Sequence, residues 1–117
     1  MEKATIYHNP ACSRSRGALA ILVERGVPHQ VVEYLATPPS ADTLASFLAM
    51  LPDPPEELVR KDKRFAELGL DPAAYRTPEQ VIALLREHPE LMQRPVVIRG
   101  GRAVIARPSE KVLEILD

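Results

Sequence analysis

The residue with the clearest capacity for chemistry is Cys12, the single cysteine of this 117-residue chain. It follows a proline-containing loop and directly precedes a helical pattern that begins at Ser13. The first N–H groups of a helix lack intrahelical partners and carry partial positive charge, so they stabilise an anion there. A lone cysteine can also be a small buried hydrophobe. Because the thiolate is the reactive form of cysteine, this position favours a nucleophile.

Side chains near Cys12 suit several supporting roles. Ser15 stands where a C-x-x-C dithiol would have its second cysteine, so any redox cycle needs an external thiol. Its hydroxyl can donate to the thiolate or cap the helix. His8 can act as a general base, stabilise the thiolate, or be an ordinary strand-end residue. Arg14 and Arg16 add positive charge.

The composition argues against several other classes of function. Fifteen basic and sixteen acidic residues give a net charge of −1, which argues against direct nucleic-acid binding. No apolar run is long enough to span a bilayer, so no membrane role is expected. The histidines and Cys12 lack the usual zinc-ligand spacings, so no metal site is predicted. One cysteine and no visible export signal indicate a reducing, cytoplasmic location.

The order of β-prone and helical runs predicts an α/β fold. Residues 4–7 and 30–34 are β-prone and flank a helix that carries Leu19, Leu22 and Val23 and stops near Gly26. A strand, helix, strand order of this length implies a right-handed crossover between two parallel strands. The first third of the chain is therefore predicted to be a βαβ unit.

The end of the chain predicts a ββα unit. Residues 96–99 and 102–105 flank Gly100 and Gly101, a two-residue link that allows positive φ at both turn positions. A last helix opens at residues 107–109. Its predicted apolar stripe consists of Val112, Leu113 and Leu116.

The segment between these units is rich in helical patterns and proline. Ser40 is a candidate cap for a helix, and a short second helix is expected at residues 56–60. Thr77 opens a capping box, with Pro78 at the first helical position and Gln80 three residues after the cap. The expected apolar faces are Leu44, Phe47, Leu48 and Leu51 in the first helix and Val81, Ile82 and Leu85 in the last. We interpret residues 1–117 as one domain with a helical insertion at approximately 36–93.

Residues 8–16, which read HNPACSRSR, resemble the active-site segment of the glutaredoxin-linked arsenate reductase family. The resemblance continues through residues 33–35, 38–39, 59–61, 67–70, 88–89, 94–97 and 107–110, and so covers nearly the whole chain. That family has a thioredoxin-like fold, a four-stranded mixed sheet with an α-helical insertion. This agrees with the βαβ and ββα ends expected from the pattern.

The resemblance also implies roles for particular residues. Cys12 matches the nucleophile, and Arg60, Arg94 and Arg107 match three arginines that surround the substrate oxyanion. Guanidinium suits this task because it stays charged and its forked donors match a tetrahedral oxyanion. Pro95 matches a proline that such folds hold in the cis form beside the active cysteine. The supporting positions are His8, Asn9, Ser15 and Arg16.

The activity that the resemblance implies is reduction of arsenate to arsenite, an arsenic-detoxification reaction. Glutathione would be the cosubstrate and glutaredoxin the partner protein, with no bound cofactor. Two alternatives stay open. Spx-type transcription regulators share the fold and contact RNA polymerase without catalysis, but many of them carry the cysteine that Ser15 replaces here. A thiol oxidoreductase of the same family could instead act on another acceptor, such as a mixed glutathione disulfide.

Overall fold

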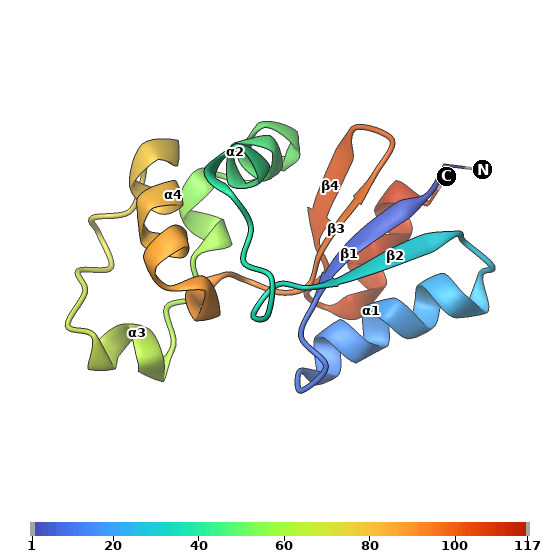
Figure 1. The fold of residues 1–117 in the computed structure, drawn as a ribbon, viewed down its shortest axis with the longest axis horizontal. Helices are drawn as coiled ribbons and strands as arrows, with labels where there is room; N and C mark the ends of the chain where they lie inside the picture. The colour runs from blue at the N-terminus through green and yellow to red at the C-terminus, as the bar shows by residue number, and fades with distance from the viewer. Residues whose placement is uncertain (1, 117) are drawn as a thin grey trace.

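Four strands form one mixed sheet in the computed structural model, which describes residues 2–116 (Figure 1). Their bounds are β1 Ala4–His8, β2 His29–Glu33, β3 Val96–Arg99 and β4 Arg102–Ile105, in the spatial order β2-β1-β3-β4. Strands β1 and β2 are parallel, whereas β1–β3 and β3–β4 are antiparallel. The predicted α/β class and four-stranded mixed sheet are therefore confirmed.

The β3–β4 hairpin has the turn that the sequence predicts. Gly100 and Gly101 have φ values of 60° and 76°. Side chains make this left-handed region unfavourable for other residues, so two consecutive glycines suit it. The register pairs Val96 with Ile105 and Arg99 with Arg102.

Helix α1 (Ser13–Glu24) covers the face of the sheet toward which alternate β1 side chains point. Burial alternates along β1, as expected when successive strand side chains face opposite sides. The helix buries Ser15, Ala18 and Leu22, which share one side of the helix. Val23 was predicted to belong to this stripe but is 60% exposed, because it lies about 100° further round the helix than Leu22.

The final helix, η3 (Ser109–Ile115), packs beside α1 and has 3-10 geometry. Three residues per turn bring Val112 and Ile115 to the same buried side. The predicted stripe of Val112, Leu113 and Leu116 is therefore only partly right, since Leu113 and Leu116 are half-buried.

The regular elements between β2 and β3 are all helices. They are α2 (Ala41–Met50), η1 (Pro55–Leu58), α3 (Lys63–Glu67), α4 (Pro78–Glu87) and η2 (Pro89–Leu91). These elements gather at one end of the molecule, on the left of Figure 1, while the sheet with α1 and η3 forms the other end. The cap predicted at Ser40 is present, because its hydroxyl accepts the Thr43 N–H across 3.1 Å. The Thr77–Gln80 capping box is also present.

The prediction of a short helix at residues 56–60 is wrong at the C-terminal end. Only residues 55–58 form a helix, and it is a 3-10 turn. Val59 instead forms an antiparallel bridge with Met92, and the Arg60 N–H donates to the Leu91 carbonyl across 2.6 Å. Pairing with a distant segment thus competes with local helix extension here. This bridge brings Arg60 next to the segment that leads into β3.

Two other details of the insertion differ from the prediction. Helix α4 buries Leu84 together with Val81 and Leu85, while Ile82 is half-buried. Helix α3 was not predicted, because five residues are too few to show helical periodicity. It is capped by Asp62, whose side chain accepts the Phe65 N–H across 3.2 Å.

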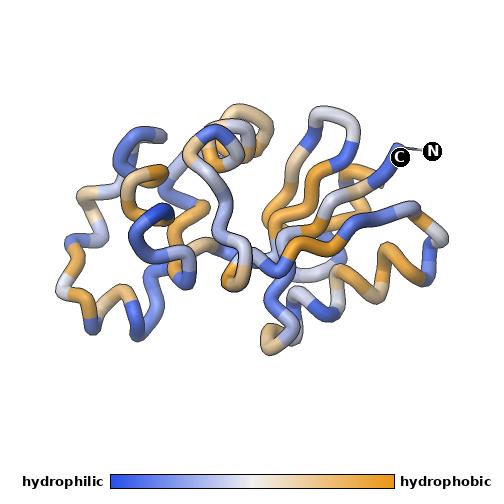
Figure 2. The backbone as a smooth tube through the Cα atoms, in the orientation of Figure 1, coloured by the Kyte–Doolittle hydropathy of each residue, from blue (hydrophilic) through white to orange (hydrophobic). Residues whose placement is uncertain are grey.

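The core consists of two hydrophobic clusters on opposite faces of the sheet. The first joins the sheet to α1 and η3, and includes Ile6, Leu22, Val97, Val104 and Val112. The second joins the other face to the insertion, and includes Tyr34, Leu44, Phe47, Val96 and Ile105. The orange stretches of Figure 2 follow these strands and helix faces. No helix in the described part of the chain is long and apolar enough to cross a membrane.

Candidate active site

Cys12 lies at the N-cap of α1, on the loop that leaves β1. Its backbone N–H donates to the Asn9 carbonyl across 3.0 Å, and its carbonyl accepts the first helical hydrogen bond from Arg16 N–H, also across 3.0 Å. The Arg16 side chain closes the loop by donating to the Pro10 carbonyl across 2.9 Å. Cys12 itself is a free, partly exposed thiol. The sulfur is thus held on a short, hydrogen-bonded loop and remains accessible.

The surroundings of Cys12 favour its thiolate. Burial raises the pKa of the thiol, but hydrogen bonds from the Ser15 backbone, the Arg94 side chain and the Arg14 backbone lower it, as does the Arg94 charge. The balance leaves the pKa of Cys12 below its usual value. The backbone donors are the unpaired N–H groups of the first helical turn. The predicted effect of the helix N-terminus is therefore accompanied by the effect of a nearby guanidinium.

His8 and Ser15 form a buried pair behind the loop. Strand alternation turns His8 toward α1, where its Nδ1 lies 2.6 Å from the Ser15 hydroxyl. The same hydroxyl accepts the Asn9 N–H across 2.9 Å. Burial lowers the pKa of His8; the charge of Glu33 and the contact with Ser15 oppose this, while Arg16 adds to it. His8 is therefore neutral at pH 7 and is bound to Ser15.

The role of Ser15 differs from both of those predicted for its side chain. The residue is fully buried, and its hydroxyl bonds to His8 and Asn9. It is the Ser15 backbone N–H that stabilises the sulfur. This follows from its position in the first turn, where the N–H points out of the helix end while the side chain faces the sheet.

Arg94 and Arg107 approach Cys12 from the two segments that flank the β3–β4 hairpin. The Arg94 guanidinium lies near enough to the sulfur to lower the pKa of the thiol, and its buried Nε has no hydrogen-bond partner among residues 2–116. Burial lowers the pKa of Arg107, followed by the charges of Arg14, Arg60 and Arg94, while the charge of Cys12 raises it. Guanidinium groups stay protonated under such conditions. Together they provide a positive environment with an unused donor.

The close approach of η3 to α1 holds Arg107 near the thiol. Ser109, two residues later, donates its hydroxyl to the Arg14 carbonyl across 2.8 Å. Gly17 makes this contact possible, because a Cβ there would lie only 2.5 Å from the Ser109 hydroxyl oxygen. The first turn of α1 and the start of η3 are thereby joined beside Cys12.

Arg60 belongs to the same group of charges but has an acidic partner. Its guanidinium forms a half-exposed ion pair with Asp62 at 2.9 Å. Its charge still affects the pKa values of Tyr34 and Arg107. An oxyanion that binds Arg60 must therefore compete with a carboxylate for this guanidinium.

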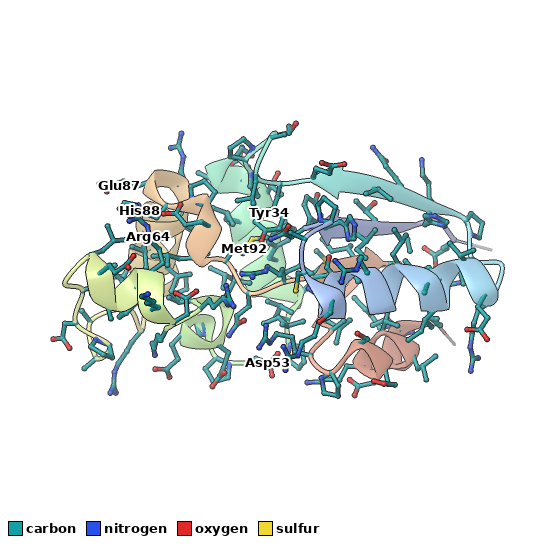
Figure 3. All side chains as sticks on the ribbon, turned by 90° about the horizontal axis from the view of Figure 1, so that it is seen from below. Tyr34, Asp53, Arg64, Glu87, His88 and Met92 are labelled. Carbon is teal, nitrogen blue, oxygen red and sulfur yellow. The ribbon has the colours of Figure 1, made fainter. Side chains whose placement is uncertain are left out.

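Tyr34 is a site residue that was not predicted from the sequence. It follows β2, is fully buried, and its hydroxyl has no hydrogen-bond partner in the described structure. Burial raises its pKa, and its hydroxyl lies within electrostatic reach of Arg94, Cys12 and Arg60. Figure 3 shows Tyr34 at the junction between the sheet and the insertion. The sequence placed Tyr34 in a β-prone run and in a segment that resembles the family, but neither signal assigned it to the site, because only the fold brings it to the cysteine loop.

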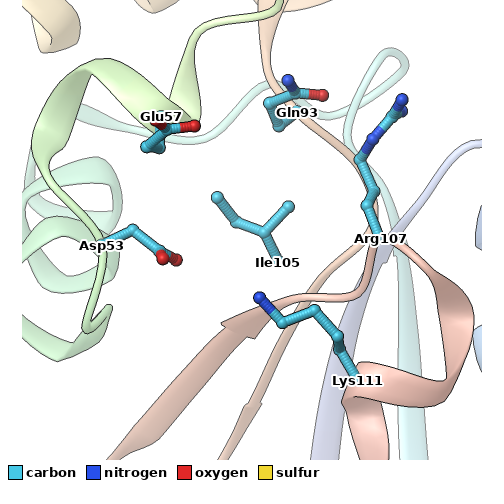
Figure 4. Close-up of a pocket in the computed structure, with 6 residues that line it drawn as sticks. All are labelled: Asp53, Glu57, Gln93, Ile105, Arg107 and Lys111. Atoms are coloured by element: carbon cyan, nitrogen blue, oxygen red, sulfur yellow. The ribbon is translucent and has the colours of Figure 1, made fainter.

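A cavity of about 210 Å³ adjoins this site (Figure 4). Asp53 and Glu57 of the insertion face it on one side, and Arg107 and Lys111 face it on the other. Gln93 also lines it, and its buried Oε1 has no hydrogen-bond partner. The cavity therefore presents both signs of charge and an unused acceptor beside Arg107.

Two further sequence expectations concern the backbone and metals. The Arg94–Pro95 peptide bond is cis, as the resemblance implies, and the Arg107–Pro108 bond is also cis, which was not predicted. Within residues 2–116, no group of three or more His, Cys, Asp and Glu side chains is arranged to hold a metal ion.

Comparisons with known proteins identify the family. The ArsC family model matches residues 7–115. An arsenate reductase of Rhizobium meliloti is 44% identical over 114 residues, covering 96% of this chain and 80% of that protein. The uncharacterised Escherichia coli protein YfgD is 43% identical and covers 98% of both chains. The solved structure of an arsenate reductase from Vibrio cholerae matches with a TM-score of 0.88 and 38% identity, over 98% of both chains. The chain has this thioredoxin-like fold and belongs to the ArsC family.

Proposed function

We propose that this protein is an arsenate reductase that uses Cys12 as its nucleophile, with glutathione and glutaredoxin as external reductants. The observation that carries the proposal is the position of Cys12 at the N-cap of α1, where the Arg94 guanidinium lowers the pKa of its thiol and Arg107 lies within electrostatic reach. A thiolate and arsenate repel each other at pH 7, so their approach requires fixed positive charge. Arsenate reductases among the relatives support arsenate as the substrate.

The first step joins sulfur to arsenic. Arg94, Arg107 and Arg60 hold dihydrogen arsenate by charge-assisted hydrogen bonds. The Cys12 thiolate attacks arsenic, a sulfur–arsenic bond forms, and one arsenic–oxygen bond breaks. The departing oxygen takes up a proton and leaves as water. No electrons have yet been transferred to arsenic, which is still arsenic(V).

The second step transfers the electrons. A glutathione thiolate attacks the Cys12 sulfur, and the pair of electrons of the sulfur–arsenic bond goes to arsenic. Arsenite, which contains arsenic(III), is released, and Cys12 is left in a mixed disulfide with glutathione. Glutaredoxin then removes the glutathione and restores the Cys12 thiolate. The single cysteine of the chain supports such a cycle, because it cannot form an internal disulfide.

We propose that glutathione binds in the cavity beside Arg107. Glutathione carries an ammonium group and carboxylates, and the cavity offers carboxylates on one wall and cations on the other. We expect Glu57→Gln to raise the KM for glutathione and leave the KM for arsenate unchanged. Glu56→Gln is the matched control, because Glu56 does not line the cavity. An unchanged glutathione KM in Glu57→Gln would argue against this location.

A coupled assay tests the proposed function directly. Purified protein is incubated with arsenate, glutathione and glutaredoxin, and arsenite is measured. We expect wild-type protein and Ser13→Ala to form arsenite, and Cys12→Ser to form none. A wild-type protein that forms no arsenite would refute the proposal. Capture of the RNA polymerase α subunit by such an inactive protein would favour the regulatory alternative.

A further inference from the structure

The side chain that the proposed mechanism leaves unused is Tyr34. It is fully buried, yet its hydroxyl has no hydrogen-bond partner among the residues that the structure describes. Buried polar groups are almost always paired, because an unpaired one loses its hydrogen bonds to water without replacement. Phenylalanine would fill nearly the same space without this penalty. The hydroxyl therefore calls for a partner that the unliganded protein does not supply.

The fold fixes where this hydroxyl lies. The last pair of the β1–β2 ladder joins His8 to Glu33, so the next residues, Asn9 and Tyr34, leave the sheet side by side. The Tyr34 ring belongs to the hydrophobic cluster shared by the sheet and the insertion. This packing holds the ring, and hence its oxygen, in one place. The oxygen is at the end of the sheet where the Cys12 loop begins.

The neighbours of the hydroxyl are those of the oxyanion site. Arg94 and Arg60 act on Tyr34 with their positive charges, and Cys12 acts with its negative charge. The Asn9 side chain lies near enough to lower the pKa of the phenol, although the two groups do not form a hydrogen bond of good geometry. The larger effect of burial raises that pKa, so the phenol keeps its proton at pH 7. Tyr34 is thus an uncharged donor among cations.

A second unpartnered donor lies close by. The Nε of Arg94 is also buried and has no hydrogen-bond partner within the described part of the chain. Nε–H of arginine can only donate, and the neutral Tyr34 hydroxyl can donate its proton. The site therefore has two buried donors, the Tyr34 hydroxyl and Arg94 Nε, that need an acceptor. The nearby positive charges favour an acceptor that is negatively charged. It must be an anion with more than one acceptor oxygen.

We propose that the Tyr34 hydroxyl donates a hydrogen bond to an oxygen of the bound oxyanion, as a fourth ligand beside Arg60, Arg94 and Arg107. This assignment rests on the proposed function, because it concerns the same tetrahedral substrate. Tyr34 adds a donor to the site without adding charge. It also couples the site to the insertion, since its ring is part of the core that holds the insertion on the sheet.

The decisive experiment uses Cys12→Ser protein, which can bind arsenate but cannot form the sulfur–arsenic bond. Arsenate affinity is measured by calorimetry with and without the additional change Tyr34→Phe. A hydrogen bond to a charged group is worth about tenfold to a hundredfold in affinity, so we expect a loss in that range. Tyr75→Phe is the matched control, because Tyr75 packs on Phe65 in the insertion. We expect the control to bind like its parent.

A stability measurement separates a ligand-binding role from a structural one. Without ligand, the Tyr34 hydroxyl makes no hydrogen bond that Tyr34→Phe would remove. We therefore expect the Tm of unliganded Tyr34→Phe to be equal to or above that of the wild type. A lowered Tm with unchanged arsenate affinity would show that Tyr34 is only structural, and would overturn the inference.

Two other outcomes are informative. If Cys12→Ser protein itself binds no arsenate, the proposed function fails, and the role of Tyr34 fails with it. If Cys12→Ser binds arsenate and Tyr34→Phe does not weaken binding, only the role of Tyr34 fails. A last measurement compares the Cys12 pKa, obtained by titrating the thiolate absorbance, between the wild type and Tyr34→Phe. A raised Cys12 pKa in Tyr34→Phe with unaltered oxyanion affinity would assign the hydroxyl to the sulfur and overturn the inference.

Discussion

His8 Nδ1 and Ser15 Oγ lie 2.6 Å apart and tie the last residue of β1 to the first turn of α1. The loop between them carries Cys12. The Ser15 hydroxyl also accepts the Asn9 N–H, so it joins the His8 ring to the backbone of the loop. The position of Cys12 thus depends on a buried pair on the inner side of the loop.

Replacing Ser15 separates the role of its side chain, which binds His8, from the role of its backbone N–H, which stabilises the sulfur. Ser15→Ala leaves His8 Nδ1 and the Asn9 N–H without their partner, and we expect the free energy of unfolding to fall by about 1–3 kcal/mol. The backbone N–H that stabilises the thiolate is retained, so the Cys12 alkylation rate should change little. Urea unfolding and alkylation kinetics measure the two effects. Ser13→Ala, at an exposed serine, is the control, and equal stability of the two variants would contradict the buried pair.

The stability of the protein should fall on mild acidification because of His8. Its pKa is lowered in the folded state, chiefly by burial, so the unfolded chain binds the proton more readily. Folding stability is then complete above the unfolded pKa of about 6.5 and is lost as the pH falls below it. We expect the Tm to drop between neutral and mildly acidic pH.

The control for this pH dependence is His8→Asn, which keeps a polar group near Ser15 but does not titrate. This variant should have a lower Tm at neutral pH and a flatter dependence on pH than the wild type. The Tm of both proteins is measured by scanning calorimetry across the same buffers. The same acid-induced loss of Tm in both proteins would show that another group is responsible.

Removing the charge of Arg94 should weaken Cys12 as a nucleophile. The Arg94 guanidinium is one of the groups that lower the pKa of the Cys12 thiol. In Arg94→Gln we expect a higher Cys12 pKa, and hence a several-fold slower alkylation at neutral pH, where less thiolate is present. The pH dependence of the iodoacetamide reaction measures this. Arg86→Gln, at an exposed arginine of α4, should react like the wild type, and identical profiles for both variants would refute this role of Arg94.

Releasing Arg60 from its ion pair should improve oxyanion binding. Asp62 occupies the Arg60 guanidinium at 2.9 Å and also caps α3. Asparagine caps helices as well as aspartate does, so Asp62→Asn removes the charge and keeps the cap. A half-exposed ion pair contributes at most about 1 kcal/mol. We therefore expect the KM for arsenate to fall by up to about fivefold.

The matched control for Asp62 is Asp42→Asn, an acidic residue in the first turn of α2. It should leave the KM for arsenate unchanged. A raised KM in Asp62→Asn would mean that the carboxylate positions Arg60 for the substrate. That result would contradict the expectation that Asp62 competes with the oxyanion for Arg60.

The sequence by itself determined the local elements and the place of Cys12 at the start of a helix. Gly100-Gly101 specifies its turn through backbone freedom, Thr77 and Gln80 specify a helix start through local hydrogen bonds, and Cys12 lies at a helix N-terminus because Ser13 begins one. Such features depend on residues within a few positions of each other. They are therefore readable from the chain without its fold, and the structure agrees with them.

Only the tertiary structure decided which distant groups meet. The Val59–Met92 bridge replaces the last turn of an expected helix and brings Arg60 toward the segment of Arg94. The ladder between β1 and β2 delivers Tyr34 to the cysteine loop, where no local pattern marked it. Long-range pairing and burial set these contacts, and their free energies outweigh local helical preference. The direction of a side chain such as Ser15 is likewise set by what the fold packs against it.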